Sequence, residues 1–325
     1  MKPPFHCLTL PTPYPVGDVN VYLFPARRAD EFLTLFDTGP SWPPARDHLL
    51  TGLADLGFAV SQLGQIILSH PHPDHVGLAA ELAAVSGARV LAHAQSAPRL
   101  SADPTGARRE FDFFSVWAEQ NGVPTEVWQQ FLLAQAESLE HQEPVTPTTL
   151  LGDGDRLSLA GADWLVLSTP GHSGGLICLF QQESRVLVAS DHLIRHISSN
   201  PILEPPGPED SERPKRLLQY LEQLQRVASL EPTVAFTGHG APVREVARLV
   251  QDRLSFHHDR AERIRNELAD GPLTVYRLAR RLFPGASSPV PLFLALSEVQ
   301  GHLDLLQKER RADVNGSSPR LWYRL

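Results

Sequence analysis

The sequence contains little cysteine and no long apolar run, and both absences narrow the class of protein. Only Cys7 and Cys178 occur among the 325 residues, which excludes a disulfide framework and any Cys-x-x-Cys motif. Cys178 lies in the apolar run 176–180 and is expected to be buried in the core. No stretch of eighteen apolar residues is present, so we expect no transmembrane helix. Any bound metal is therefore expected to have nitrogen and oxygen ligands.

The N-terminus also lacks the continuous apolar segment of a signal peptide, because prolines interrupt it, and we expect a cytoplasmic protein. The net charge is −8 and is unevenly spread. Residues 256–325 hold 11 Lys and Arg against 8 Asp and Glu, whereas residues 1–255 hold 18 against 29. This acidic main body argues against a general phosphate-binding surface.

Strand and helix patterns alternate twice along the chain, as expected for an α/β protein. The first series covers residues 19–93 and the second covers residues 155–240. An aromatic-rich helical insert at about 95–148 separates them, and we expect most of its aromatic side chains to be core residues rather than a lid. Beyond residue 242, three helical patterns precede an Asn-Gly-Ser-Ser turn signal at 315–318. This order is typical of a winged helix, so we predict a catalytic domain at 1–250 and a winged-helix-like domain at 251–325.

The densest group of ionisable side chains is His70-Pro71-His72-Pro73-Asp74-His75. It follows a short apolar strand pattern at residues 65–70. Alternation along an extended chain places His70 and His72 on the same side, where both imidazoles can bind one ion. The chain must turn after Pro73, so Asp74 and His75 point elsewhere. The two prolines also restrict the backbone, which reduces the entropy lost when the ligands are ordered.

Three more candidate ligands stand at the ends of later strand patterns, beside glycine or another small residue that lets the backbone approach a small cavity. They are His172 in Pro-Gly-His-Ser-Gly-Gly, Asp191 in Ala-Ser-Asp-His and His239 in Thr-Gly-His-Gly. We predict that His70, His72 and His172 hold a first ion, that Asp74, His75 and His239 hold a second, and that Asp191 bridges them. Two divalent ions about 3.5–4 Å apart can hold a bridging hydroxide as nucleophile.

These motifs, in this order, resemble those of the metallo-β-lactamase-fold hydrolases over residues 5–245. The resemblance implies a four-layer αβ/βα sandwich with the metals at the edge between two sheets. It also places Asp37, at the end of the early strand pattern 32–39, behind the metal ligands. There Asp37 is expected to accept the second N–H of a ligating histidine. The helical tail is similar to that of the lactamase-beta-2-like and glyoxalase-II-related members.

The chemistry favoured by this site is attack of a metal-bound hydroxide on a small ester, thioester or lactone. Asp74 is the predicted catalytic residue, because it would both bind the second ion and orient the hydroxide. Zinc fits the nitrogen-rich ligands best, with iron or manganese as alternatives. His192 is expected to line the pocket wall or support a ligand from behind, with a catalytic role as the alternative. His196 and Asn200 are equally consistent with substrate contact and with ordinary loop polarity.

Two other functions remain open at this point. One is a phosphodiesterase or endoribonuclease, and the other is a non-enzymatic DNA-binding sensor of a metal or ligand. We expect the tail to pack on the catalytic domain or to form a homodimer rather than to bind nucleic acid. The remaining histidines lack a ligand context and are expected on the surface or in the core: His6, His48, His93, His141, His257, His258 and His302.

Overall fold

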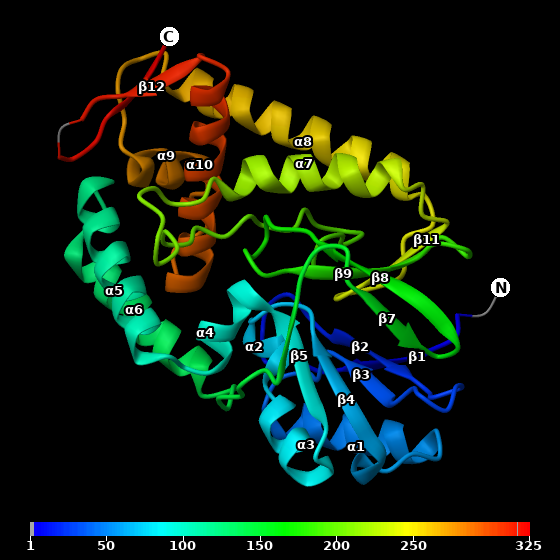
Figure 1. Ribbon diagram of the computed structural model, residues 1–325. Coiled ribbons are helices and arrows are strands. Elements are labelled where there is room, and N and C mark those ends of the chain that lie inside the picture. The colour runs from blue at the N-terminus through cyan, green and yellow to red at the C-terminus, as the bar shows by residue number, and fades with distance from the viewer. Residues whose placement is uncertain (1–2, 317) are drawn as a thin grey trace.

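Two β-sheets lie face to face, and helices cover their outer faces (Figure 1). The computed structural model describes residues 3–316 and 318–325. Helices α1 (Pro43–Asp55) and α3 (Ala79–Ser86) cover the first sheet, and α7 (Arg216–Ser229) and α8 (Val246–Glu267) cover the second. The predicted α/β class and four-layer sandwich are therefore confirmed.

The first sheet has six strands in the order β1-β2-β3-β4-β5-β6. Strands β1 to β3 pair antiparallel, and β3 to β6 pair parallel. The bounds are β1 His6–Leu10, β2 Val19–Phe24, β3 Leu33–Phe36, β4 Leu63–Leu68, β5 Arg89–His93 and β6 Thr149–Leu151. β2 and β3 are buried along their whole length, because helices and the second sheet cover both faces.

The second sheet has five strands in the order β11-β10-β9-β8-β7. Its strands are antiparallel except for the parallel pair β10 and β11, which α7 connects. The bounds are β7 Arg156–Leu159, β8 Ala162–Ser168, β9 Ile177–Gln181, β10 Val186–Ser190 and β11 Val234–Thr237. Between the sheets, Phe5 packs against the rings of Tyr22, Phe24 and Trp164. This shared core fixes how the ends of the two sheets meet.

The insert and the C-terminal segment pack together at one end of the sandwich (Figure 1). The insert forms α5 (Pro104–Gln120) and α6 (Thr125–Leu139), and the C-terminal segment forms α9 (Val275–Leu282) and α10 (Pro289–Lys308). Phe131 of α6 stacks on Phe293 of α10, with ring centroids 4.4 Å apart. The insert aromatics Phe114, Trp117 and Phe131 are buried, which matches the expectation that most of these side chains are core.

The C-terminal segment ends in an antiparallel pair, β12 (Ala312–Val314) and β13 (Trp322–Arg324). The elements thus follow the order of a winged helix, although the assignment to that fold and the division at residue 250 remain predictions. Residue 317, in the predicted turn at 315–318, lies outside the described residues. Among the described residues, no helix combines the length and the apolar character needed to cross a bilayer.

The remaining elements are short and connect the longer ones. They are η1 (Val60–Gln62), α2 (Pro73–Val76), η2 (Ala94–Ser96) and α4 (Ala97–Leu100). α2 matters most for function, because it begins inside the histidine motif. Pro73 stands at its first position, where a missing backbone N–H costs nothing.

Candidate metal centre

The predicted ligands all follow the C-terminal ends of strands, and these ends meet at one edge of the sandwich. His70 and His72 follow β4, and α2 then carries Asp74 and His75. The loops after β8, β10 and β11 supply the other three, His172, Asp191 and His239. Segments more than 160 residues apart in the chain are therefore brought to a single place.

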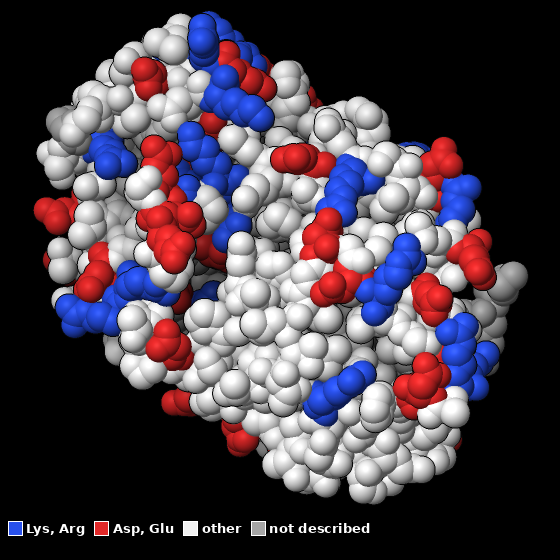
Figure 2. Space-filling view, in the orientation of Figure 1, with Lys and Arg blue, Asp and Glu red and all other residues white. Residues whose placement is uncertain are grey.

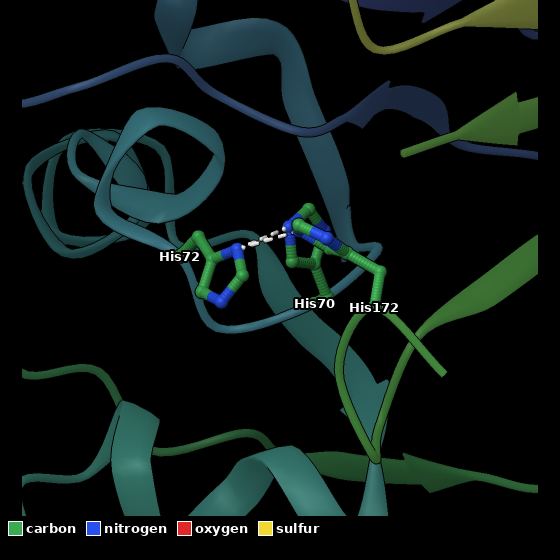
Figure 3. Close-up of side chains that lie close together, drawn as sticks. All are labelled: His70, His72 and His172. Carbon is green, nitrogen blue, oxygen red and sulfur yellow. Dashed lines mark hydrogen bonds between the residues drawn. The ribbon is translucent and has the colours of Figure 1, made fainter. Parts of the chain in front are cut away.

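Three imidazoles converge on one point in the first cluster (Figure 3). His72 Nδ1 lies 2.9 Å from His70 Nε2 and 2.9 Å from His172 Nε2. His172 Nδ1 lies 2.9 Å from the carbonyl oxygen of Asn200. Because a carbonyl oxygen only accepts, Nδ1 carries the proton and Nε2 of His172 presents a lone pair to the cluster. That tautomer is the one that can bind a cation.

Asp74, His75 and His239 form the second cluster. His239 Nε2 lies 3.3 Å from Asp74 Oδ2. His239 Nδ1 donates to the carbonyl oxygen of Asp18 at 2.8 Å, and His75 Nδ1 donates to Asp37 Oδ2 at 2.9 Å. Both rings therefore turn their Nε2 atoms toward Asp74, as a second cation would require.

Asp191 lies between the two clusters. Its Oδ1 is 3.4 Å from His75 Nε2, and its Oδ2 is 3.6 Å from His239 Nε2 and 3.7 Å from His172 Nε2. One carboxylate thus faces ligands of both clusters, which is the geometry predicted for a bridging residue.

Buried atoms without partners provide an independent test of whether a cation fits here. Among the described residues, His75 Nε2, His239 Nε2 and Asp191 Oδ1 are buried and have no hydrogen-bond partner. Such atoms cost free energy unless something satisfies them. All three face the same small space between the clusters, so divalent ions would satisfy them together. The residues fit a metal centre.

The electrostatics of His70 and Asp74 agree with this conclusion, whereas without metal the nearby carboxylates Asp191 and Asp74 outweigh burial and raise the pKa values of His75 and His239. Burial, with His75 and His72 nearby, holds the pKa of His70 well below its ordinary value, so its imidazole is neutral and able to bind metal at pH 7. Burial alone would raise the pKa of Asp74, but His75 and His239 lower it to about 2. Asp74 is therefore a carboxylate at neutral pH.

Asp37 supports both clusters from behind. Its Oδ2 accepts from His75 Nδ1 and, at 2.7 Å, from the hydroxyl of Ser69. Since that hydroxyl donates to Asp37, it accepts from His70 Nδ1 at 2.9 Å. Asp37 thus orients His75 directly and His70 through Ser69, which is a wider contact than the predicted one.

The structure also places the other residues singled out in the sequence. His192, the residue after Asp191, is fully buried and packs edge-on against Tyr220, with ring centroids 5.6 Å apart. Burial lowers its pKa to about 3. The sequence did not reveal that the carbonyl oxygens of Asp18 and Asn200 hold His239 and His172. Every residue has a carbonyl, so no side-chain signal marks these two positions.

Comparison with known proteins identifies the family. Residues 14–239 match the Metallo-beta-lactamase superfamily. The chain is 34% identical over 304 residues to the "Probable metallo-hydrolase YqjP" of Bacillus subtilis, covering 93% of this chain and 92% of that protein. It is also 27% identical over 122 residues to an "Atrochrysone carboxyl ACP thioesterase" of Aspergillus fumigatus, covering 38% of this chain and 35% of that protein.

A solved structure is similar along the whole chain. The metallo-beta-lactamase family protein TTHA1429 of Thermus thermophilus is 30% identical, with a TM-score of 0.84 and coverage of 100% of this chain and 99% of that chain. Together with the geometry of the centre, these findings show that the chain belongs to the metallo-β-lactamase superfamily and is a metallo-hydrolase.

Proposed function

We propose that the chain hydrolyses a small ester, thioester or lactone at a centre of two divalent ions. The observation that carries the proposal is the pair of clusters that share Asp191, because such a centre supplies a nucleophile without a serine or cysteine. Similarity to a thioesterase of Aspergillus fumigatus supports an acyl substrate.

The two clusters would hold one ion each. His70, His72 and His172 would bind the first, Asp74, His75 and His239 would bind the second, and Asp191 would contact both. When bound, the ions would lower the pKa of water toward about 7 and polarise the acyl carbonyl. Zinc suits this set of five imidazoles and two carboxylates best, and iron or manganese would also accept it.

Asp74 is the proposed catalytic residue of this chain. Its side chain is 13% exposed, whereas those of His75 and His239 are 0% and 1% exposed. Because Asp74 is ionised at neutral pH, a carboxylate oxygen is free to accept a hydrogen bond from the attacking water and orient it. His192 is too deeply buried to reach a substrate, and we propose that it supports Asp191 from behind.

A substrate screen with matched variants tests the function. Zinc-loaded protein would be assayed on acetyl thioesters, lactones, a phosphodiester and RNA, beside His72→Ala, Asp74→Ala and His48→Ala. We expect turnover of an acyl substrate, reduced at least about 100-fold in the first two variants because each lacks a metal ligand. His48 is exposed and lies away from the centre, so its variant should match the parent chain. Turnover of only RNA or the phosphodiester would overturn the proposal.

A further inference from the structure

A pocket of about 330 Å³ lies where the segment after β10 meets the C-terminal helices. Residues 196–201 form one wall, Arg253, Phe256 and His257 of α8 form another, and Glu298 of α10 completes it. This volume is within the range of pockets that hold small ligands, and the lining is mostly polar, with Ile197, Pro201 and Phe256 as its apolar residues.

The pocket shares its wall with the metal centre at two points. The carbonyl oxygen of Asn200 holds His172 of the first cluster. The ring of His196 lies 3.0 Å from the position that a Cβ would take on Gly240, the residue after His239 of the second cluster. These two contacts place the pocket directly beside the metal centre.

A directed chain of hydrogen bonds fixes the pocket wall. His302 Nδ1 lies 2.7 Å from the carbonyl oxygen of Glu298, so it donates. His257 Nδ1 then donates to His302 Nε2 at 3.1 Å, and the Ser198 hydroxyl donates to His257 Nε2 at 2.9 Å. In this arrangement both imidazoles are neutral. Burial, with His302 and Arg253 nearby, lowers the pKa of His257 to about 3, so the ring adds no charge to the pocket at neutral pH.

Arg253 gives the pocket its charge. It is the one Lys or Arg side chain that lines the pocket within the described part of the chain. One of its terminal nitrogens donates to the carbonyl oxygens of Ile194 and Arg195, at 3.1 and 3.0 Å. Within the described residues it has no carboxylate partner within 4.0 Å, whereas Glu298 is paired with Arg260 at 3.0 Å. The guanidinium charge is therefore left without an acidic partner beside a pocket.

A second observation points to a ligand. The Ser199 hydroxyl, in the same wall, is buried and has no hydrogen-bond partner among the described residues, and the residue is 2% exposed. A buried hydroxyl without a partner costs free energy. A ligand acceptor that reached Ser199 from the pocket would satisfy this hydroxyl.

We propose that this pocket binds a carboxylate carried by the acyl substrate, with Arg253 as the residue that determines this preference. The proposal rests on the acyl-hydrolase function proposed above. A carboxylate accepts hydrogen bonds from a guanidinium in a defined geometry. A single charge fits better than the double charge of a phosphate, because Arg253 is one cation and Glu298 is close by.

Matched pairs of substrates test the preference. Acetyl thioesters of ω-mercaptocarboxylic acids of increasing chain length would each be compared with the thioester of the corresponding primary amide, which has nearly the same shape and no charge. We expect kcat/KM to be about 10-fold or more higher for the acid at the best chain length. Equal values for acid and amide at every length would overturn the proposal while leaving acyl hydrolysis established.

Variants of Arg253 assign the preference to this residue. Arg253→Gln removes the charge but keeps a donor for the two carbonyls, Arg253→Lys keeps the charge, and Arg248→Gln changes an exposed arginine on the same helix. In Arg253→Gln we expect nearly equal kcat/KM values for acid and amide. The preference for the acid should persist in part in Arg253→Lys and be unchanged in Arg248→Gln. A preference that survives in Arg253→Gln would overturn the assignment.

A binding measurement separates this proposal from the function on which it rests. In protein stripped of metal, saturation-transfer NMR would follow 3-(ethylthio)propionate and its amide, with inorganic phosphate as a competitor. We expect the acid to bind and the amide to bind weakly or not at all, with the difference lost in Arg253→Gln. This result would support the pocket even if no thioester were hydrolysed. Absence of acid binding, or displacement of the acid by phosphate at lower concentration, would overturn it.

Discussion

At the scale of single residues, Asp37 is the side chain that links the two clusters of metal ligands. It accepts from His75 directly and supports His70 through Ser69. It also accepts from the backbone N–H of Ser69 at 2.7 Å. A carboxylate so placed fixes the tautomers of ligands on both sides of the centre.

Asp37→Asn should therefore weaken metal binding while keeping the shape of the side chain. An amide has one acceptor oxygen instead of two, so it cannot serve His75 and Ser69 as Asp37 does. We expect metal affinity to fall about 10- to 100-fold, measured by competition with a chelator of known affinity. Asp163→Asn is the control, because Asp163 is exposed and pairs only with the surface residue Arg28 among the described residues. Equal affinities for parent and Asp37→Asn would contradict this role.

The buried pair His257 and His302 predicts how stability depends on pH. Burial lowers the pKa of His257 to about 3 and that of His302 to about 4, from 6.5. The unfolded chain therefore takes up these protons first as the pH falls, and the folded state loses stability below pH 6.5 until the folded-state pKa values are reached. Each histidine should lower the free energy of unfolding by about 2 kcal/mol between pH 6.5 and 5.

Urea unfolding of metal-free protein at pH 7 and pH 5 measures this effect without the contribution of the metals. His302→Gln should lose less stability than the parent chain over that interval, because one titrating group is gone. The exposed residue His258 provides the control variant, His258→Gln. Equal losses for the parent chain and His302→Gln would show that His302 does not carry the effect.

The candidate ligands were noticed because histidines and aspartates follow strand ends beside glycine, proline or another small residue, and Asp37 follows such an end too. The carbonyl oxygens of Asp18 and Asn200, which hold His239 and His172, could not be predicted in this way, because they belong to the backbone. The pairing of His257 with His302 was also missed, since the two lie 45 residues apart and neither stands beside a motif. Only the packing of α8 on α10 brings them together.

At the scale of secondary structure, the turn after β8 positions His172 against α7. Gly171 has φ +154°, and a Cβ added there would lie 2.5 Å from the Cβ of Tyr220 on α7. The glycine is thus required by a close approach of two elements. Tyr220 is itself fully buried, so it cannot move aside easily.

Gly171→Ala should destabilise the protein and disturb the first cluster together. The clash should cost about 1–3 kcal/mol in free energy of unfolding, as overpacking does, and should displace His172. Gly154→Ala is a matched control, because Gly154 also has a positive φ, +90°, but a Cβ there meets nothing within 4 Å. Its variant should lose only the modest energy of backbone strain and should keep both metals. A Gly171→Ala protein with unchanged unfolding and metal content would contradict this view of the turn.

Most helices and central strands were predictable because their apolar periodicity is strong. The pattern at 19–24 matches β2, and the pattern at 243–268 encloses α8. β1 and β6 were not predicted. β6 has only three residues, two of them exposed, and β1 begins after a run of prolines, so neither presents a clear apolar alternation.

At the scale of the whole molecule, the insert and the C-terminal helices form one hydrophobic core beside the sandwich. The sequence showed that both segments are helical and which faces are apolar. It could not show that each covers the other, because an apolar face does not specify its partner. The pocket beside Arg253 was unforeseen for the same reason, since it exists only where α8, α10 and the segment after β10 meet.

The charges on one face of the molecule bear on whether it binds nucleic acid. On the face seen in Figure 2, Lys and Arg side chains are intermixed with Asp and Glu, as expected for a chain with a net charge of −8. Nucleic-acid binding generally draws on a basic patch or stripe. The winged-helix-like order of the C-terminal elements therefore does not by itself argue for DNA or RNA.

The most direct test of the two-ion centre is a crystal structure of zinc-loaded protein with anomalous diffraction recorded at the zinc edge. We expect two zinc peaks per chain, one bound by His70, His72 and His172 and the other by Asp74, His75 and His239, with Asp191 contacting both. Zinc bound anywhere else, or a centre that stays empty while its imidazoles point apart, would contradict it.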